Sequence, residues 1–214
     1  MRTFALISLF LFLAFNVHAQ DDATKSFIQV MGALNQQAAQ AQNQGDYAQA
    51  EESRRQLVSL MEQVNFRPSE IARQLSNLAS VLNLINKPKD AQVELERALE
   101  LLDSNPTSDR LQLAVLNGNL GEALLKQGVY DSARTRYEIE LDILRDLSME
   151  NTHFSASARI GIGAIEAELG NVDEALGHYE FAIRIFRSLS DDSHPVTSRV
   201  LGEYEELQRK AEVR

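Results

Sequence analysis

The segment GNVDEALGHYEFAI, from Gly170 to Ile183, determines how this chain folds. A glycine and a short polar turn lead into a pattern of helical spacing that includes Ala175 and Tyr179. Two earlier segments have the same form, GVYDSARTRYEIEL (Gly128 to Leu141) and GDYAQAEESRRQLV (Gly45 to Val58). The sequence therefore predicts that one type of helix start occurs several times.

The repeat has a period of about 42 residues, marked by a small residue just inside each predicted helix: Ala50, Ala91, Ala133 and Ala175. Five residues before these alanines stand Gly45, Asn86, Gly128 and Gly170. Glycine and asparagine readily adopt the left-handed conformation that ends a helix. Each unit is therefore predicted to contain one helix, a left-handed stop and a second helix.

Small residues also lie twelve positions before each alanine, at Ala38, Ala79, Gly121 and Gly163, where they allow two antiparallel helices to approach closely. Four residues after the alanine comes a large packing residue, Leu95, Tyr137 or Tyr179. The first unit has Arg54 instead and is atypical, as terminal repeats often are. A final helix with Leu201, Tyr204 and Leu207 on one face is predicted to cap the stack.

Three segments resemble the tetratricopeptide repeat family, in the long-helix variety of kinesin light chain: Asn77 to Leu101, Asn119 to Glu138 and Gly161 to Ile183. The resemblance covers about residues 26–213. It implies an all-α fold, a right-handed α-solenoid of helix-turn-helix hairpins with a C-terminal capping helix. The repeats are expected at about 26–64, 68–104, 108–149 and 152–190, with the capping helix at 195–213.

The first 19 residues have the three parts of a secretory signal peptide: a basic start, an apolar core from Phe4 to Phe15, and small or slim residues before a cleavage site after Ala19. The alternative is an uncleaved N-terminal anchor. We expect an exported chain, periplasmic or secreted, with one domain at 20–214 and no membrane insertion after cleavage. The net charge of −10 argues against nucleic-acid binding.

No catalytic or metal-binding pattern is evident, so the sequence predicts a protein that is not an enzyme and has no cofactor or metal. His153, His178 and His194 lack the spacing of metal ligands. Gly161 and Gly163 lack the third glycine of a nucleotide-binding loop and are interpreted as close-packing residues. The acidic stretch of Glu138, Glu140 and Asp142 is interpreted as a solvated face.

By resemblance, Asn77 and Asn119 face the concave groove, where an amide can pair with a peptide backbone. The fourth unit has Gly161 at this position, which cannot take part. The alternative is that both asparagines only bridge backbone groups between helices. Helical spacing adds further groove candidates: Asn35, Arg73, Asn83, Glu122, Lys126 and Arg159.

The expected function is an exported scaffold or adaptor that binds a peptide segment or a protein partner in this groove. The alternative is a structural subunit or homo-oligomer of an envelope complex that stacks through its end helices. The basic clamp that some family members use for a peptide carboxylate is not matched, because Arg73 and Lys126 are isolated.

Overall fold

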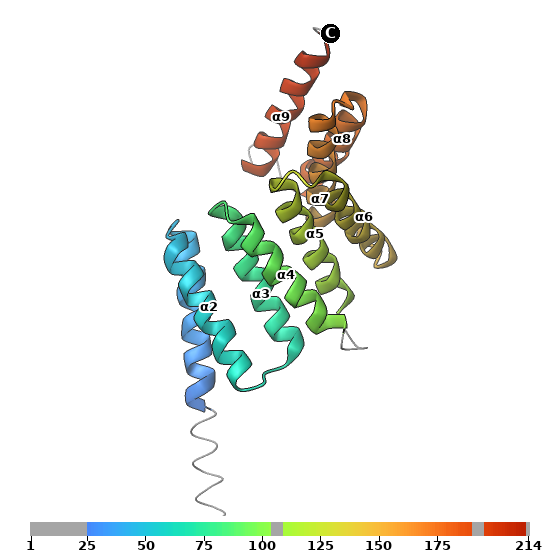
Figure 1. Cartoon of the computed structure of the whole chain (residues 1–214). Coiled ribbons are helices and arrows are strands. Elements are labelled where there is room, and N and C mark those ends of the chain that lie inside the picture. Colours follow the sequence, from blue (N-terminus) through green and yellow to red (C-terminus); the bar gives the residue numbers. More distant parts are fainter. Residues whose placement is uncertain (1–24, 104–108, 190–194, 213–214) are drawn as a thin grey trace, which may run out of the picture. The chain divides into compact units, whose positions relative to one another are not determined.

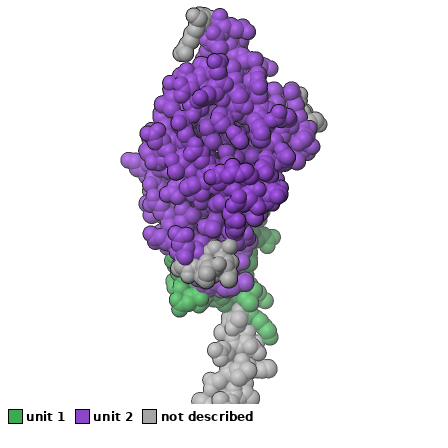
Figure 2. Space-filling view, turned by 90° about the vertical axis from the view of Figure 1, so that its right-hand side faces the viewer, with its two compact units in different colours: residues 1–65 green, residues 66–214 purple. Residues whose placement is uncertain are grey.

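A computed structural model describes residues 25–103, 109–189 and 195–212 of the 214-residue chain. The predicted signal peptide and His194 lie outside these residues. The chain divides into two compact units, residues 1–65 and residues 66–214 (Figure 2). The described part of the first unit contains a helix over residues 25–43 and α2 (Tyr47–Gln63).

The second unit contains seven described helices (Figure 1): α3 (Pro68–Leu84), α4 (Pro88–Asp103), α5 (Arg110–Lys126), α6 (Tyr130–Asp146), α7 (His153–Leu169), α8 (Val172–Leu189) and α9 (Pro195–Glu212). They pack as hairpins, α3 with α4, α5 with α6 and α7 with α8, and α5 also contacts both α3 and α7. The described ranges contain no β-strand. The prediction of an all-α solenoid of helical hairpins is confirmed.

The turns inside the hairpins depend on backbone conformations that most residues avoid. The residues predicted to end the first helix of each hairpin have positive φ angles, of 76° at Gly45, 59° at Asn86, 75° at Gly128 and 83° at Gly170. Asn65 and Ser148 adopt the same conformation after α2 and α6, at φ angles of 50° and 56°. The left-handed stops are thus confirmed, and two more occur where the sequence indicated only polar loops.

The hairpins pack through the small residues that define the repeat. Ala50, Ala91, Ala133 and Ala175 are completely buried, and so are Ala38 and Ala79. Gly163 of α7 takes the corresponding place near the backbone of α8, where a Cβ would lie 3.3 Å from the carbonyl oxygen of Ala175. These contacts confirm the predicted close approach of the paired helices.

The last helix covers the apolar face of α8. Val196, Leu201, Tyr204 and Leu207 of α9 pack against a buried cluster of Ala175, Tyr179, Ile183 and Val200. The Tyr204 hydroxyl also donates a 2.7 Å hydrogen bond to Glu180 of α8. This is the packing expected of a capping helix. None of the helices in the described ranges is both long and apolar enough to span a membrane.

Candidate functional site

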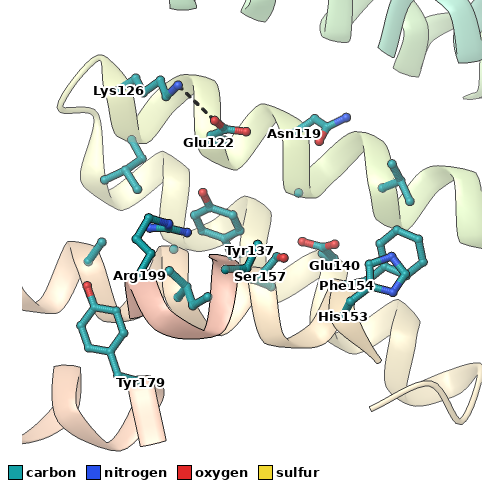
Figure 3. Close-up of a pocket in the computed structure, with 18 of the residues that line it drawn as sticks. Asn119, Glu122, Lys126, Tyr137, Glu140, His153, Phe154, Ser157, Tyr179 and Arg199 are labelled. Atoms are coloured by element: carbon teal, nitrogen blue, oxygen red, sulfur yellow. Dashed lines mark ion pairs between the residues drawn. The ribbon is translucent and has the colours of Figure 1, made fainter. Parts of the chain in front are cut away.

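A pocket of about 700 Å³ lies within the second unit, where α5 and α7 form the walls and α6 contributes side chains between them (Figure 3). Residues of α9 line one end. The polar and aromatic lining residues are Asn119, Glu122 and Lys126 of α5, Tyr137 and Glu140 of α6, His153, Phe154 and Ser157 of α7, Tyr179 of α8, and Arg199 and Glu203 of α9. The pocket therefore collects ionisable groups from five successive helices, α5 to α9.

The α5 wall is a connected polar surface. Lys126 Nζ lies 3.1 Å from Glu122 Oε1, one helical turn away, and donates a 2.9 Å hydrogen bond to the backbone carbonyl of Asn83 in α3. Asn119 Nδ2 donates a 2.9 Å hydrogen bond to Ser76 Oγ, also in α3. These contacts tie α5 to α3 and fix the direction of the side chains that face the pocket.

Tyr137 crosses from α6 into the space between α5 and α7. Its ring lies against Gly121 of α5 and Gly161 of α7, and a Cβ at Gly161 would overlap the ring. Burial, followed by the nearby Glu122 and Glu140, raises the pKa of the Tyr137 hydroxyl, which therefore stays protonated. The interpretation of Gly161 as a close-packing residue is confirmed. The glycine stands at the asparagine position of the repeat and makes room for an aromatic ring.

Glu140 lies one turn further along α6, with only 4% of its surface exposed. Its carboxyl group lies against α5 at Gly118, where a Cβ would overlap it. Burial raises the pKa of Glu140 to about 8. The interpretation of Glu140 as part of a solvated face is wrong, because this position points into the hairpin stack. Its neighbours Glu138 and Asp142 are exposed, as predicted.

Both ends of the pocket also carry ionisable side chains. At the α9 end, Arg199 donates a 2.6 Å hydrogen bond to Glu203 one turn away. Tyr179 of α8 also lines this region, and burial, with a smaller contribution from Glu203, raises its pKa to about 12. At the start of α7, the rings of His153 and Phe154 lie 3.9 Å apart.

Three of the predicted groove residues meet in this pocket, Asn119, Glu122 and Lys126. Asn119 lines the pocket and also contacts the neighbouring hairpin, where its amide donates to the Ser76 hydroxyl rather than to a backbone group.

The other predicted residues lie elsewhere. Asn77 bonds to Gln74 on its own helix at 3.3 Å, and Arg73 pairs with Glu70. The guanidinium of Arg159 lies 4.7 Å from the centre of the Phe181 ring in α8. Asn83 is buried rather than facing a groove, and Asn35 is exposed in the first unit. Helical spacing alone did not identify which residues of α3, α5 and α7 line the pocket, because side chains from α6 and α9 also form part of the lining.

The sequence analysis missed Glu140 and Tyr137 as pocket residues, although the repeat contains a signal for Glu140. It stands seven residues after the marker alanine, where the other units have Leu57, Ala98 and Ala182. All three are buried apolar residues. A carboxylic acid in this otherwise apolar column is the feature that would have pointed to the pocket.

The pocket lining offers groups that can recognise a ligand. His153 and Ser157 both line the pocket, and no hydrogen bond connects them. The described residues contain no group of three or more carboxylate, imidazole or thiol side chains placed to hold a metal ion. The lining is suited to hydrogen bonds and ion pairs with a bound segment.

Comparisons with known proteins agree with this architecture. The sequence profile described as tetratricopeptide repeat matches residues 111–188. The crystal structure of BtubC (BKLC) from P. vanneervenii has a TM-score of 0.61 and 21% identity, covering 84% of this chain and 67% of that chain. The apo form of RapI has a TM-score of 0.69 and 17% identity, covering 85% of this chain and 64% of that chain.

This chain thus spans about two thirds of the length of either structure, and at these identities the likeness concerns the fold alone. No curated protein sequence matches the chain significantly. The profile match falls on α5 to α8, which supply most of the pocket. The match thus shows that residues 111–188 are similar to tetratricopeptide repeats, and the helical hairpins of the second unit have the packing expected of such repeats.

Proposed function

We propose that this protein is an exported, non-enzymatic scaffold that binds an extended segment of a protein partner in the pocket between α5 and α7. The observation that carries the proposal is the pocket itself. It offers about 700 Å³ on the first helices of two successive hairpins, and its lining combines amide, carboxylate and aromatic groups. A peptide backbone can pair with such groups while its side chains occupy the space between the helices.

Export is proposed from the signal-peptide pattern of residues 1–19. The alternative role, stacking through the end helices, receives no support from α9. The large apolar side chains that are exposed in the described ranges do not include any from this helix. Its outward positions carry charged residues such as Glu206 and Lys210, which pair with each other at 2.7 Å.

Selection of peptides from a random display library on the chain from Gln20 to Arg214 tests the proposed site. Ser157→Trp is the informative variant, because Ser157 is exposed and lines the pocket, so that an indole there would fill it. Ser132→Trp is the matched control, since Ser132 is exposed in the first turn of α6 and does not line the pocket.

We expect the selected peptides to bind the wild-type chain and Ser132→Trp with equal affinity and to lose at least tenfold in affinity for Ser157→Trp. Peptides that bind all three proteins equally well would show that the pocket is not the binding site. Failure to select any peptide would contradict the proposal of segment binding.

A further inference from the structure

The position of Glu140 in the pocket suggests which chemistry the bound segment carries. A carboxylic acid replaces the apolar residue of the other repeats, Leu57, Ala98 and Ala182. It is 96% buried and lines the pocket. Gly118 of α5 leaves the space that the carboxyl group occupies, since any side chain there would overlap it. Two unusual residues thus place an acid where a hydrophobic side chain would pack.

The acid has no hydrogen bond or ion pair with any described residue. The two cations that line the pocket are already paired, Lys126 with Glu122 at 3.1 Å and Arg199 with Glu203 at 2.6 Å. Figure 3 shows the Glu140 carboxyl group between the α5 and α7 walls, with Ser157 and Phe154 drawn on the α7 side. The carboxyl group faces the pocket without a protein partner, and a ligand that supplies a cation would favour its ionised form.

We propose that the pocket binds a lysine or arginine side chain of the partner segment, whose cationic group pairs with the carboxylate of Glu140. This inference rests on the proposed function and specifies the chemistry of the segment. The pocket also suits the aliphatic stem of such a residue, because Val115, Ile160 and the Phe154 ring line it. The net charge of −10 favours the approach of a basic segment.

The pairing predicts that ligand binding and proton release are linked. In the ligand-free protein the pKa of Glu140 is about 8, so the group is largely protonated at pH 7, whereas pairing with a cation favours the ionised form. The affinity should therefore increase as the pH rises towards 8. The other ionisable groups that line the pocket are Glu122 and Lys126 of α5, Tyr137 of α6, His153 of α7, Tyr179 of α8, and Arg199 and Glu203 of α9.

Glu140→Gln isolates the contribution of the acid, because it removes this group and retains every other ionisable residue that lines the pocket. Gln closely matches the shape of a protonated Glu, so the variant should fold normally. Glu138→Gln is the matched control, since Glu138 is exposed on the same helix and does not line the pocket.

The experiment uses three blocked pentapeptides, acetyl-Gly-Gly-X-Gly-Gly-amide, in which X is arginine, lysine or citrulline, the neutral analogue of arginine. Binding is followed by NMR chemical shifts at pH 6.5, 7.2 and 8. We expect wild type and Glu138→Gln to bind the arginine and lysine peptides at least tenfold more tightly than the citrulline peptide at pH 8. Glu140→Gln should lose this preference and the part of the pH dependence above pH 7.

Equal binding of the arginine and citrulline peptides to wild type would overturn the inference, as would undetectable binding of the arginine peptide at millimolar concentration. A cation preference that persists in Glu140→Gln would overturn it too. The two proposals can be tested independently. If display-selected peptides lose affinity for Ser157→Trp but bind Glu140→Gln and wild type equally well, the pocket binds a segment and the proposed role of Glu140 is wrong.

Discussion

At the scale of single residues, glycines in α5 and α7 leave space for the large side chains that line the pocket. Tyr137 is held between Gly121 and Gly161, and the Glu140 carboxyl group lies against Gly118. Each of these glycines lies inside a helix, where glycine is less favourable than alanine by roughly 0.5–1 kcal/mol. Their presence in α5 and α7 is explained by the large side chains that α6 directs between these helices.

Gly161→Ala should destabilise the protein by about 1–3 kcal/mol, because the added methyl group overlaps the Tyr137 ring, which Gly121 confines on its other side. Gly177→Ala is the contrasting variant. No atom lies within 4 Å of a Cβ added at Gly177 in α8, so this variant should be more stable by roughly 0.5–1 kcal/mol. Urea unfolding measures both, and equal effects of the two substitutions would contradict the packing around Tyr137.

Glu140 should make the stability of the protein depend on pH. Its pKa is raised from an ordinary 4.5 to about 8, so above pH 4.5 the native state retains a proton that the unfolded chain releases. The free energy of unfolding therefore decreases between about pH 4.5 and pH 8, by at most ~1.4 kcal/mol per pH unit from this group. Above pH 8 both states are ionised and this contribution no longer changes.

Glu140→Gln removes this titration. We expect the stability of the variant relative to wild type to increase progressively from pH 5 to pH 8. At pH 8 the difference should be on the order of a few kcal/mol, as the raised pKa of Glu140 implies. Denaturant unfolding at pH 5, 6.5 and 8 measures the difference, with Glu138→Gln as a control that follows wild type. Parallel curves for wild type and Glu140→Gln would show that the acid is not buried as described.

At the scale of helices and turns, the left-handed residues end the helices at fixed places in the repeat. Gly128 has a φ of 75°, and nothing lies within 4 Å of a Cβ placed there, so its role is conformational. Ser148 has a φ of 56° after α6 without the freedom of glycine. An L-residue in this conformation loses roughly 1–2 kcal/mol relative to its preferred conformations.

Gly128→Ala should therefore lower the free energy of unfolding by about 1 kcal/mol, whereas Ser148→Gly should leave it unchanged or raise it by up to about 1 kcal/mol. Thermal and urea unfolding of the two variants check this pair. Destabilisation by Ser148→Gly comparable to that by Gly128→Ala would argue that the Ser148 side chain, rather than its backbone, is what stabilises the turn.

The sequence predicted this level of structure well, because its determinants are local. The stops at Gly45, Asn86, Gly128 and Gly170 follow from residue type and a fixed distance to a buried alanine. The site was predicted less completely. Asn119 was identified as a groove residue, yet its bond to Ser76 depends on how two hairpins meet. Glu140 was misinterpreted because its sequence neighbours are acidic and exposed, whereas its burial comes from α5.

At the scale of the whole molecule, the capping helix predicts how the chain behaves in solution. α9 covers Tyr179 and Ile183 of α8 with its apolar residues and carries charged residues on its outer surface. We expect light scattering to give the mass of a single chain for residues 20–214. Deletion of residues 195–214 should expose the apolar cluster, lower the Tm and cause association. A wild-type chain that forms a defined oligomer would instead favour the structural role.

A further prediction concerns the mature N-terminus. If the first 19 residues act as a signal peptide, mass spectrometry of the protein from its native cells should identify Gln20 as the first residue. Detection of peptides that begin at Met1 or Arg2 in the bulk of the protein would contradict cleavage and support the N-terminal anchor.

The binding site itself is tested most directly by mapping the backbone amide chemical shifts of the 15N-labelled chain during titration with a display-selected peptide. The proposed function predicts that the shifts concentrate on residues that line the pocket, such as Asn119, Glu122, Ser157 and Gly161. Shifts confined to the exposed faces of α4, α6 or α8, with the amides around the pocket unchanged, would contradict it.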